Sequence, residues 1–362
     1  MIDGVRRRAA KLPIVHNADD FVRHYIGEAE KAWRHGSGQE VTLVFGQLTI
    51  VVRFIGSSLE NVVLPVLRHA AAKNNPTTPQ TIVYAVACDE TGFPNPPPEW
   101  PFPIDSKAAQ MRTHWNLADG PVLSSDESRG IWHLHDMSRQ IGLYWVSSTA
   151  ELPYWEFGSA LRHHIFWGSL ACNQCMLHCA VVSRGQRGAL IAGPGGSGKS
   201  TLTAAAIQSG WHTTGDDFVA ISNLDKPVSY RLFDVLKLTG MAETVFREIS
   251  SQALNPERVA GEKALIRLSD ACPQSFVESI PLDVILSAKL VHEPESRIVP
   301  TSRLNLVRAL VPNTASLVRT GFEQIFSFSS ELMRSLPCFE FQIGKNPIEA
   351  LQVLDAFLQE QK

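Results

Sequence analysis

The chain has 362 residues, of which 33 are Lys or Arg and 36 are Asp or Glu, and its formal net charge is −3. Proteins that bind nucleic acid or an anionic membrane surface carry a basic excess, so this balance argues against both classes. Because no apolar run is long enough to span a membrane or to act as a secretory signal, we expect a cytoplasmic protein whose six cysteines are free thiols.

A chain of this length exceeds one ordinary compact core, so we expect two domains, the first over residues 1–125. Residues 40–56 (EVTLVFGQLTIVVRFIG) predict two strands around a turn at Gly46-Gln47, and residues 81–88 (TIVYAVAC) predict a third. Between them, SLENVVLPVLRHAAAKNN has helical spacing interrupted by Pro65. The prolines of residues 92–103 mark a connector or an exposed loop. The pattern indicates a small α+β module, which is a candidate for substrate recognition.

The second domain, expected over residues 126–362, alternates strand and helix patterns and is predicted to be α/β. Residues 129–148 predict a strand pair, and residues 154–175 have apolar residues at helical spacing. MLHCAVVSRGQRGALIAGPGG predicts two strands around a turn at Gly185, and the second strand runs into a glycine-rich loop. The helix after that loop is expected to end at Gly210, and an amphipathic helix begins near Pro347.

The glycine-rich loop, GPGGSGKS from Gly193 to Ser200, matches the phosphate-binding P-loop pattern in full. Its glycines let backbone N–H groups turn toward an anion, and the helix that follows adds its positive N-terminal end. In such loops the lysine contacts the outer phosphates, and the hydroxyl after it contacts Mg²⁺. The residues expected to bind ATP are Gly193, Gly195, Gly196, Ser197, Gly198, Lys199, Ser200 and Thr201.

Two adjacent carboxylates, Asp216 and Asp217, follow Lys199 by seventeen residues. After one helix and a turn, the next strand would bring them to the sheet edge beside the phosphates. Neighbouring side chains at a strand end point in different directions. One carboxylate can therefore hold Mg²⁺ while the other accepts a proton from an incoming hydroxyl. We expect the metal site at Ser200 and Asp216, while the choice of base between the two aspartates stays open.

His178 precedes Lys199 by twenty-one residues and lies on the strand that should pair with the one feeding the loop. Its strand would end near the same edge, which makes it a candidate catalytic residue, whereas His163 and His164 are expected to be structural. The spacing of CNQCMLHC also permits a zinc site at residues 172–179, but buried core cysteines are the favoured interpretation.

These features together resemble the HPr kinase/phosphorylase superfamily. The resemblance rests on LHCAVV, GALIAGPGGSGKSTL and GDDFVAIS, and it is strong over residues 152–222. There the chain is similar to bacterial HPr-kinase-like serine kinases, some of which phosphorylate a precursor peptide's C-terminal serine in lasso-peptide biosynthesis. The resemblance implies a C-terminal P-loop domain with a mixed sheet, of the HPr-kinase and PEP-carboxykinase type, preceded by a smaller α+β domain.

The resemblance also implies site residues beyond the motifs. It places His178 near the transferred phosphate and makes Lys237, Glu243 and Lys263 candidates for further charged contacts there. The glycine-rich signature that follows the aspartates in true HPr kinases is absent, because LKLTGMAETVFREIS occupies that region. The resemblance therefore does not extend to recognition of HPr or to the reverse phosphorolysis.

We expect an ATP- and Mg²⁺-dependent kinase that phosphorylates a serine hydroxyl of a peptide or protein, for instance a precursor peptide in natural-product biosynthesis. A small-molecule hydroxyl kinase, a regulatory kinase of the HPr type and a nucleotide-dependent switch without phosphate transfer stay open as alternatives. No nucleic-acid or membrane partner is expected, and the resemblance allows a homo-oligomer.

Overall fold

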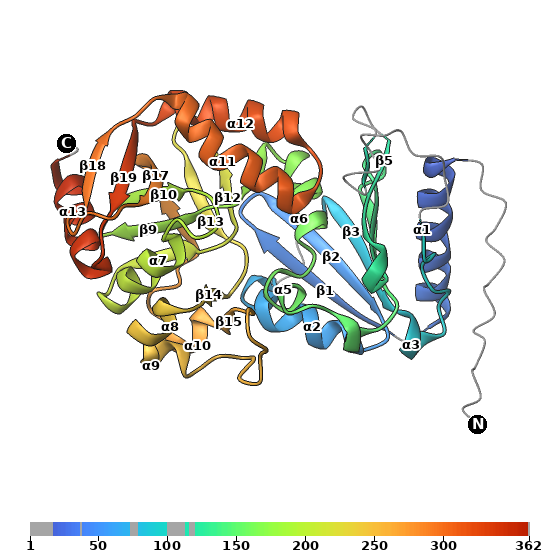
Figure 1. Cartoon of the computed structure of the whole chain (residues 1–362). Helices are drawn as coiled ribbons and strands as arrows, with labels where there is room; N and C mark the ends of the chain where they lie inside the picture. Colours follow the sequence, from blue (N-terminus) through green and yellow to red (C-terminus); the bar gives the residue numbers. More distant parts are fainter. Residues whose placement is uncertain (1–16, 37, 73–78, 100–112, 116–119, 361–362) are drawn as a thin grey trace.

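The N-terminal part of the chain forms one mixed seven-stranded sheet with helices on both faces (Figure 1). The computed structural model describes residues 17–36, 38–72, 79–99, 113–115 and 120–360, so the expected connector at residues 92–103 lies partly outside the described residues. The strand order is β1-β2-β3-β7-β6-β5-β4. The strands are β1 (Gly38–Phe45), β2 (Leu48–Ile55), β3 (Thr81–Ala87), β4 (Thr113–Trp115), β5 (Pro121–Asp126), β6 (Ile131–Asp136) and β7 (Ile141–Val146).

Strand β3 shows how this sheet is covered on both faces. Because successive strand residues point to opposite sides, Tyr84 and Val86 pack in the same cluster as α1, whereas Val83 and Ala85 pack in the cluster that includes α2 and α6. A strand buried on both faces reads as a continuous apolar run, as the sequence of β3 does. The helices of this part are α1 (Ala18–His35), α2 (Ser58–Leu67), α3 (Cys88–Thr91), α5 (Tyr154–Ser159) and α6 (Arg162–Leu170).

The first sheet does not stop at the expected boundary between residues 125 and 126. That boundary cuts β5, and β6 and β7 continue the same sheet because β7 pairs in parallel with β3. The single helix suggested over residues 154–175 is instead two short helices, α5 and α6, separated at Leu161, whose φ of 63° cannot continue a right-handed helix.

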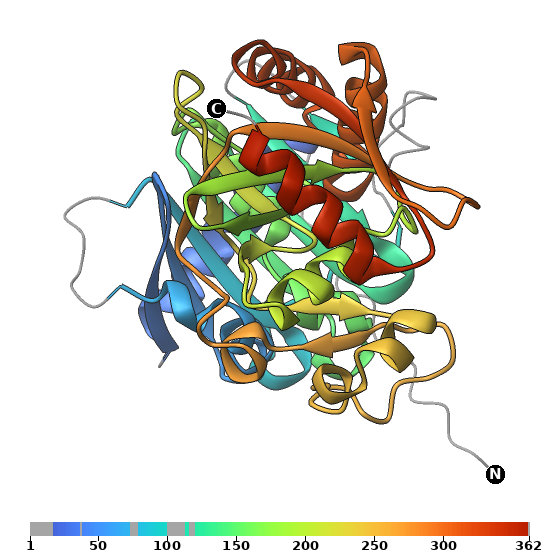
Figure 2. The same ribbon diagram turned by 90° about the vertical axis from the view of Figure 1, so that its left-hand side faces the viewer.

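The second large sheet has six strands in the order β11-β9-β10-β17-β19-β18, and β10, β17 and β19 run parallel. Figure 2 shows α13 (red) and α7 (yellow-green) side by side, and both pack on its outer face. Its strands are β9 (Ala180–Arg184), β10 (Arg187–Ala192), β11 (His212–Gly215), β17 (Val284–Leu290), β18 (Arg297–Pro300) and β19 (Cys338–Ile343). The helices on its two faces are α7 (Lys199–Gln208), α11 (Arg303–Val318), α12 (Phe322–Ser335) and α13 (Pro347–Glu360).

Two smaller sheets complete the second half, in the orders β16-β13-β12-β8 and β14-β15. Their strands are β8 (Gln174–Leu177), β12 (Val219–Ser222), β13 (Val228–Arg231), β14 (Leu236–Leu238), β15 (Ala264–Ile266) and β16 (Ser279–Pro281). The short helices beside β14 and β15 are α8 (Met241–Val245), α9 (Arg247–Ser250) and α10 (Leu268–Ala271). Strand β10 runs directly into the glycine-rich loop and α7 follows it, as the sequence predicts.

One hydrophobic cluster joins the two halves of the molecule. It contains residues of β1 and β2 from the first sheet, Leu190 and Ile285 from the second, and apolar side chains of α6 and α11 between them. The two halves therefore pack against each other through a shared hydrophobic core and are not independent domains joined by a linker. Among the described residues, no helix is long and apolar enough to cross a membrane.

Gly188, in the strand that feeds the glycine-rich loop, provides a test of this packing. A Cβ added there would lie 2.0 Å from the backbone oxygen of Pro281. We expect Gly188→Ala to lower the free energy of unfolding by about 1–3 kcal/mol, because backbone must shift to admit the methyl group.

The matched control is Gly27→Ala in α1, where an added Cβ meets nothing within 4 Å. That change should stabilise the protein by up to about 1 kcal/mol through helix propensity. Urea unfolding followed by circular dichroism measures both variants, and equal stabilities would contradict the described packing of β10.

Candidate active site

The glycine-rich loop connects the buried end of β10 to the first turn of α7. Gly196 (φ 80°) and Gly198 (φ 96°) adopt the left-handed conformation that favours glycine. A Cβ at Gly195 or Gly196 would meet nothing within 4 Å, so the loop presents its backbone to open space there. Backbone N–H groups and a helix N-terminus that face open space suit an anion.

Lys199, the first residue of α7, folds back over this loop. Its Nζ donates to the carbonyl oxygens of Gly193 at 2.7 Å and of Pro194 at 3.1 Å. The side chain is buried, and burial lowers the pKa of the ammonium group even though Asp216 and Asp217 act in the opposite direction. The structure thus holds a desolvated positive charge at the mouth of the loop, where a phosphate could replace the carbonyl contacts.

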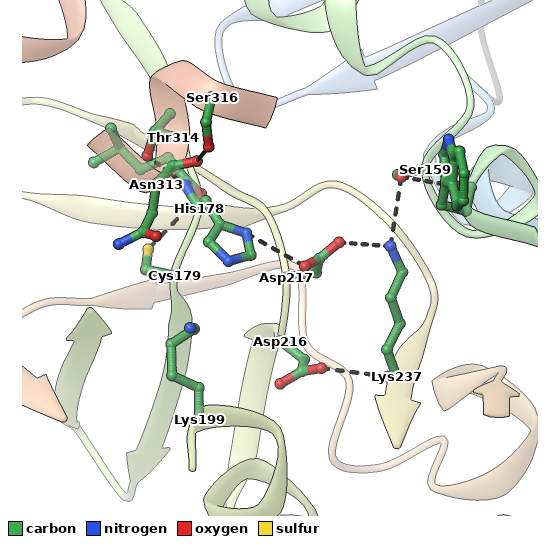
Figure 3. A network of polar contacts seen from close by, with 12 residues as sticks. Ser159, His178, Cys179, Lys199, Asp216, Asp217, Lys237, Asn313, Thr314 and Ser316 are labelled. Carbon is green, nitrogen blue, oxygen red and sulfur yellow. Dashed lines mark hydrogen bonds and ion pairs between the residues drawn. The ribbon is translucent and has the colours of Figure 1, made fainter. Parts of the chain in front are cut away.

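Asp217 lies in the turn between β11 and β12 and is held by two side chains (Figure 3). Its Oδ2 accepts a hydrogen bond from Lys237 Nζ at 2.6 Å, and its Oδ1 lies 3.3 Å from His178 Nδ1. Burial by itself raises the pKa of this carboxyl, but the charge of Lys237 and then His178 outweigh it and hold the pKa below its usual range. Asp217 is therefore ionised over the whole physiological range.

Asp216, its neighbour, has the opposite environment. It is almost fully buried; its Oδ2 accepts the Lys237 backbone N–H at 3.3 Å, and its Oδ1 has no hydrogen-bond partner among the described residues. Burial and the adjacent charge of Asp217 raise the pKa of this carboxyl to about 6, while the Lys237 amide and the Ser200 hydroxyl act in the opposite direction. A buried carboxylate oxygen without a donor is an available ligand atom.

His178 follows the last residue of β8 and is fixed from two sides. Its backbone N–H donates to Thr314 Oγ1 at 2.9 Å, and its ring packs edge-on against Phe218 at 5.3 Å between centroids. Burial lowers the pKa of the imidazole to about 4, although Asp217 acts in the opposite direction. The ring is consequently neutral at pH 7 and can donate one hydrogen bond and accept another.

The structure brings most of the candidate residues together in one cleft. Lys263 lines it with Lys237, but Gly193 and Glu243 do not. The Gly193 carbonyl accepts from Lys199, and the Glu243 carboxylate pairs with Arg258. The candidates that line the cleft are His178, Gly195, Gly196, Ser197, Gly198, Lys199, Ser200, Thr201, Asp216, Asp217, Lys237 and Lys263.

Two positioning residues carry no signal in the sequence. Ser159, at the end of α5, lies with its Oγ 3.5 Å from Lys237 Nζ, and Thr314, in α11, holds the His178 backbone. Both belong to helices far from the motifs in the chain, and an isolated Ser or Thr has no pattern that would single it out. The expected core role of the cysteines agrees with the complete burial of Cys175 and Cys179.

Comparison with known proteins adds a weak structural likeness. No family model and no curated protein matches the sequence. Among solved structures, the chain is similar to the HPr(Ser) kinase/phosphatase from Coxiella burnetii, with 12% identity and a TM-score of 0.30 over 51% of this chain and 97% of that chain. An identity and a TM-score this low do not indicate a function, so the geometry of the cleft is the basis for the function proposed below.

The raised pKa of Asp216 predicts that this residue destabilises the fold. Its pKa is about 6 in the folded protein against an ordinary 3.8, so stability is lost as the pH rises from 3.8 to 6. In buffer with EDTA, we expect Asp216→Asn to raise the free energy of unfolding by about 2–3 kcal/mol at pH 7.5.

The gain should shrink as the pH falls below 6 and nearly vanish at about pH 3, where the wild-type carboxyl is protonated in both the folded and the unfolded state. Urea unfolding at several pH values measures the difference, with Asp225→Asn at an exposed position as the control. A pH-independent difference would mean that Asp216 is not held as described.

Proposed function

We propose that the chain is an ATP-dependent kinase that transfers the γ-phosphoryl group to a serine hydroxyl of a peptide or protein. The observation that carries this proposal is the meeting of three groups in one cleft: the complete phosphate-binding loop, the Asp216-Asp217 pair, and the cations of Lys199 and Lys237. Phosphoryl transfer needs little covalent chemistry from the protein, and positioned charges supply most of the rate acceleration.

The loop would hold the nucleotide through its backbone. Residues 195–201 line the cleft, and their backbone amides would surround the outer phosphates, with the N-terminus of α7 behind them. Lys199 Nζ would exchange the carbonyl oxygens of Gly193 and Pro194 for phosphate oxygens. Such an exchange would tie the position of the lysine to the presence of ATP.

Ser200 and Asp216 fit a magnesium ion, because the unpartnered Oδ1 of Asp216 is a hard oxygen ligand in the same cleft as a hydroxyl. When bound, Mg²⁺ would neutralise charge on the β- and γ-phosphates. The described residues contain no group of three or more His, Cys, Asp or Glu side chains that could hold a metal alone. Mg²⁺ commonly takes few protein ligands and completes its shell with water and phosphate oxygens, so this arrangement is adequate for it.

Asp217 would receive the proton of the acceptor hydroxyl. The serine oxygen attacks the γ-phosphorus, the bond from that phosphorus to the ADP oxygen breaks, and the hydroxyl proton passes to the carboxylate. Lys237 keeps Asp217 ionised and fixes one of its oxygens at 2.6 Å. His178 stays neutral beside the other oxygen, so it can orient the carboxylate without adding a charge. A protein that only senses ATP does not need a carboxylate fixed in this way. The arrangement therefore favours phosphate transfer over nucleotide sensing.

Lys199→Ala should bind ATP more weakly and lose phosphate transfer by at least about 10²-fold, because a positioned cation on the transferred group is removed. The assay incubates the protein with radiolabelled ATP, Mg²⁺ and a set of serine-terminated peptides, and mass spectrometry locates the phosphoserine. Lys226→Ala, at an exposed loop position, is the control. Near-native transfer by Lys199→Ala, or ATP binding by the wild type without transfer to any hydroxyl, would refute the proposal.

Asp217→Asn should keep ATP affinity and lose transfer by about 10²–10⁴-fold, since the amide cannot accept the proton. Circular dichroism checks folding, calorimetric titration with ATP measures the affinity, and the same peptide assay measures the rate. Asp225→Asn serves again as the matched change at an exposed aspartate. The proposed mechanism fails if Asp217→Asn transfers phosphate at near the wild-type rate.

A further inference from the structure

A second cavity opens beside the catalytic cleft, between the first half of the molecule and the β14–β15 lobe. Its volume is about 410 Å³, and residues from α2, α5 and the segment around β15 line it. This size lies within the range of pockets that bind organic ligands. The lining is mainly apolar, with Val62, Leu152, Phe157, Leu254 and Leu265. We refer to it as the apolar groove.

The apolar groove and the catalytic cleft share one wall. In the antiparallel pair of β14 and β15, Lys237 stands directly opposite Leu265. Lys237 lines the cleft, whereas Leu265 lines the groove. Directly opposed residues in such a pair lie only about 4.5–5.5 Å apart with their side chains on the same face, so the two spaces lie side by side over one face of the strand pair.

Helix α5 closes over this shared wall at Gly158. A Cβ added to Gly158 would lie 2.8 Å from Lys237 Cε and 3.3 Å from Leu265 Cδ2. The next residue, Ser159, reaches Lys237 Nζ, and the preceding residue, Phe157, lines the groove. Three consecutive residues of α5 thus run from the groove to the ion pair at Asp217, so this short segment borders both spaces.

The rim of the groove exposes apolar side chains to water. Phe157 is 39% exposed and Leu254 is 42% exposed. Covering the exposed part of these side chains with an apolar ligand removes apolar surface from water, which favours binding. The two charged residues in the lining, Glu262 and Arg267, have opposite signs and select neither an acidic nor a basic ligand. An apolar occupant therefore fits the groove best.

We propose that the apolar groove binds the hydrophobic side chains that flank the acceptor serine in an extended peptide substrate. This inference rests on the proposed kinase function and adds the substrate class. An extended chain advances about 3.3 Å per residue, so a side chain one to three residues from the serine reaches the groove while the hydroxyl faces Asp217. A small alcohol would fill only the cleft and would leave the groove empty.

The test measures peptide binding separately from phosphate transfer. Two fluorescent hexapeptides carry one serine, flanked by Leu and Phe in the first and by Ala in the second. Fluorescence anisotropy in the presence of a non-hydrolysable ATP analogue gives their affinities. Wild-type protein should bind the Leu/Phe peptide about tenfold or more tightly than the Ala peptide, the ratio expected for one buried apolar side chain.

Leu254→Asp should abolish that preference, and Phe157→Ser provides a second variant on a different element. Leu304→Asp, the same change at a 56% exposed leucine of α11, is the matched control and should keep the preference. Calorimetry with the ATP analogue should give unchanged nucleotide affinity in all three variants. Sedimentation velocity shows whether either groove variant instead changes self-association.

Loss of the preference in Leu254→Asp and Phe157→Ser, but not in Leu304→Asp, supports the inference. Equal binding of both peptides, an unchanged preference in both groove variants, or a shift in oligomeric state in place of peptide binding would overturn it. A Leu/Phe peptide that binds in the groove but receives no phosphate would refute the kinase function, whereas the assignment of the groove as a peptide-binding site would still hold. The two failures are therefore distinguishable.

Discussion

The buried ion pair between Lys237 and Asp217 is the contact on which the rest of the site depends. It joins β14 to the turn between β11 and β12, and the Lys237 ammonium also reaches Ser159 of α5. Both charges are largely withdrawn from water, so the loss of either would leave the other without compensation. The pair thus fixes three segments that lie far apart in the chain, and it holds Asp217 ionised where a hydroxyl could reach it.

The two adjacent aspartates show how one turn can hold two different carboxyl groups. Asp217 is held ionised by Lys237, and its charge helps raise the pKa of Asp216. Environments that push neighbouring pKa values apart are typical of functional sites and do not favour folding. The lysines around His178 reinforce the burial that keeps the imidazole neutral. A bound polyphosphate would relieve the crowding of cations in the cleft, and a divalent cation would satisfy the free Oδ1 of Asp216.

The sequence predicts best those parts of the candidate site whose residues are contiguous in the chain. The loop, the helix after it and the strand before it are contiguous, so their pattern alone gave their arrangement. His178 could be placed near the loop because β9 and β10 form a hairpin that returns the chain to the same region. Ser159, Thr314 and the extent of the first sheet depend on contacts between distant segments, which periodicity does not encode. Glu243 lay at a suitable distance in the sequence, but the short helix α8 turns it toward Arg258.

The seven-stranded sheet is coupled to His178 through packed helices. On α6, Trp167 Nε1 donates to Thr320 Oγ1 at 2.9 Å, and His163 Nδ1 contacts the Val318 carbonyl at 3.0 Å. Those two contacts fix the C-terminal end of α11, whose Thr314 holds the backbone of His178 at 2.9 Å. On the other side, α5 brings Ser159 to Lys237. The first half of the chain thus supports both partners of Asp217, so a change in its packing would alter the position of this carboxylate.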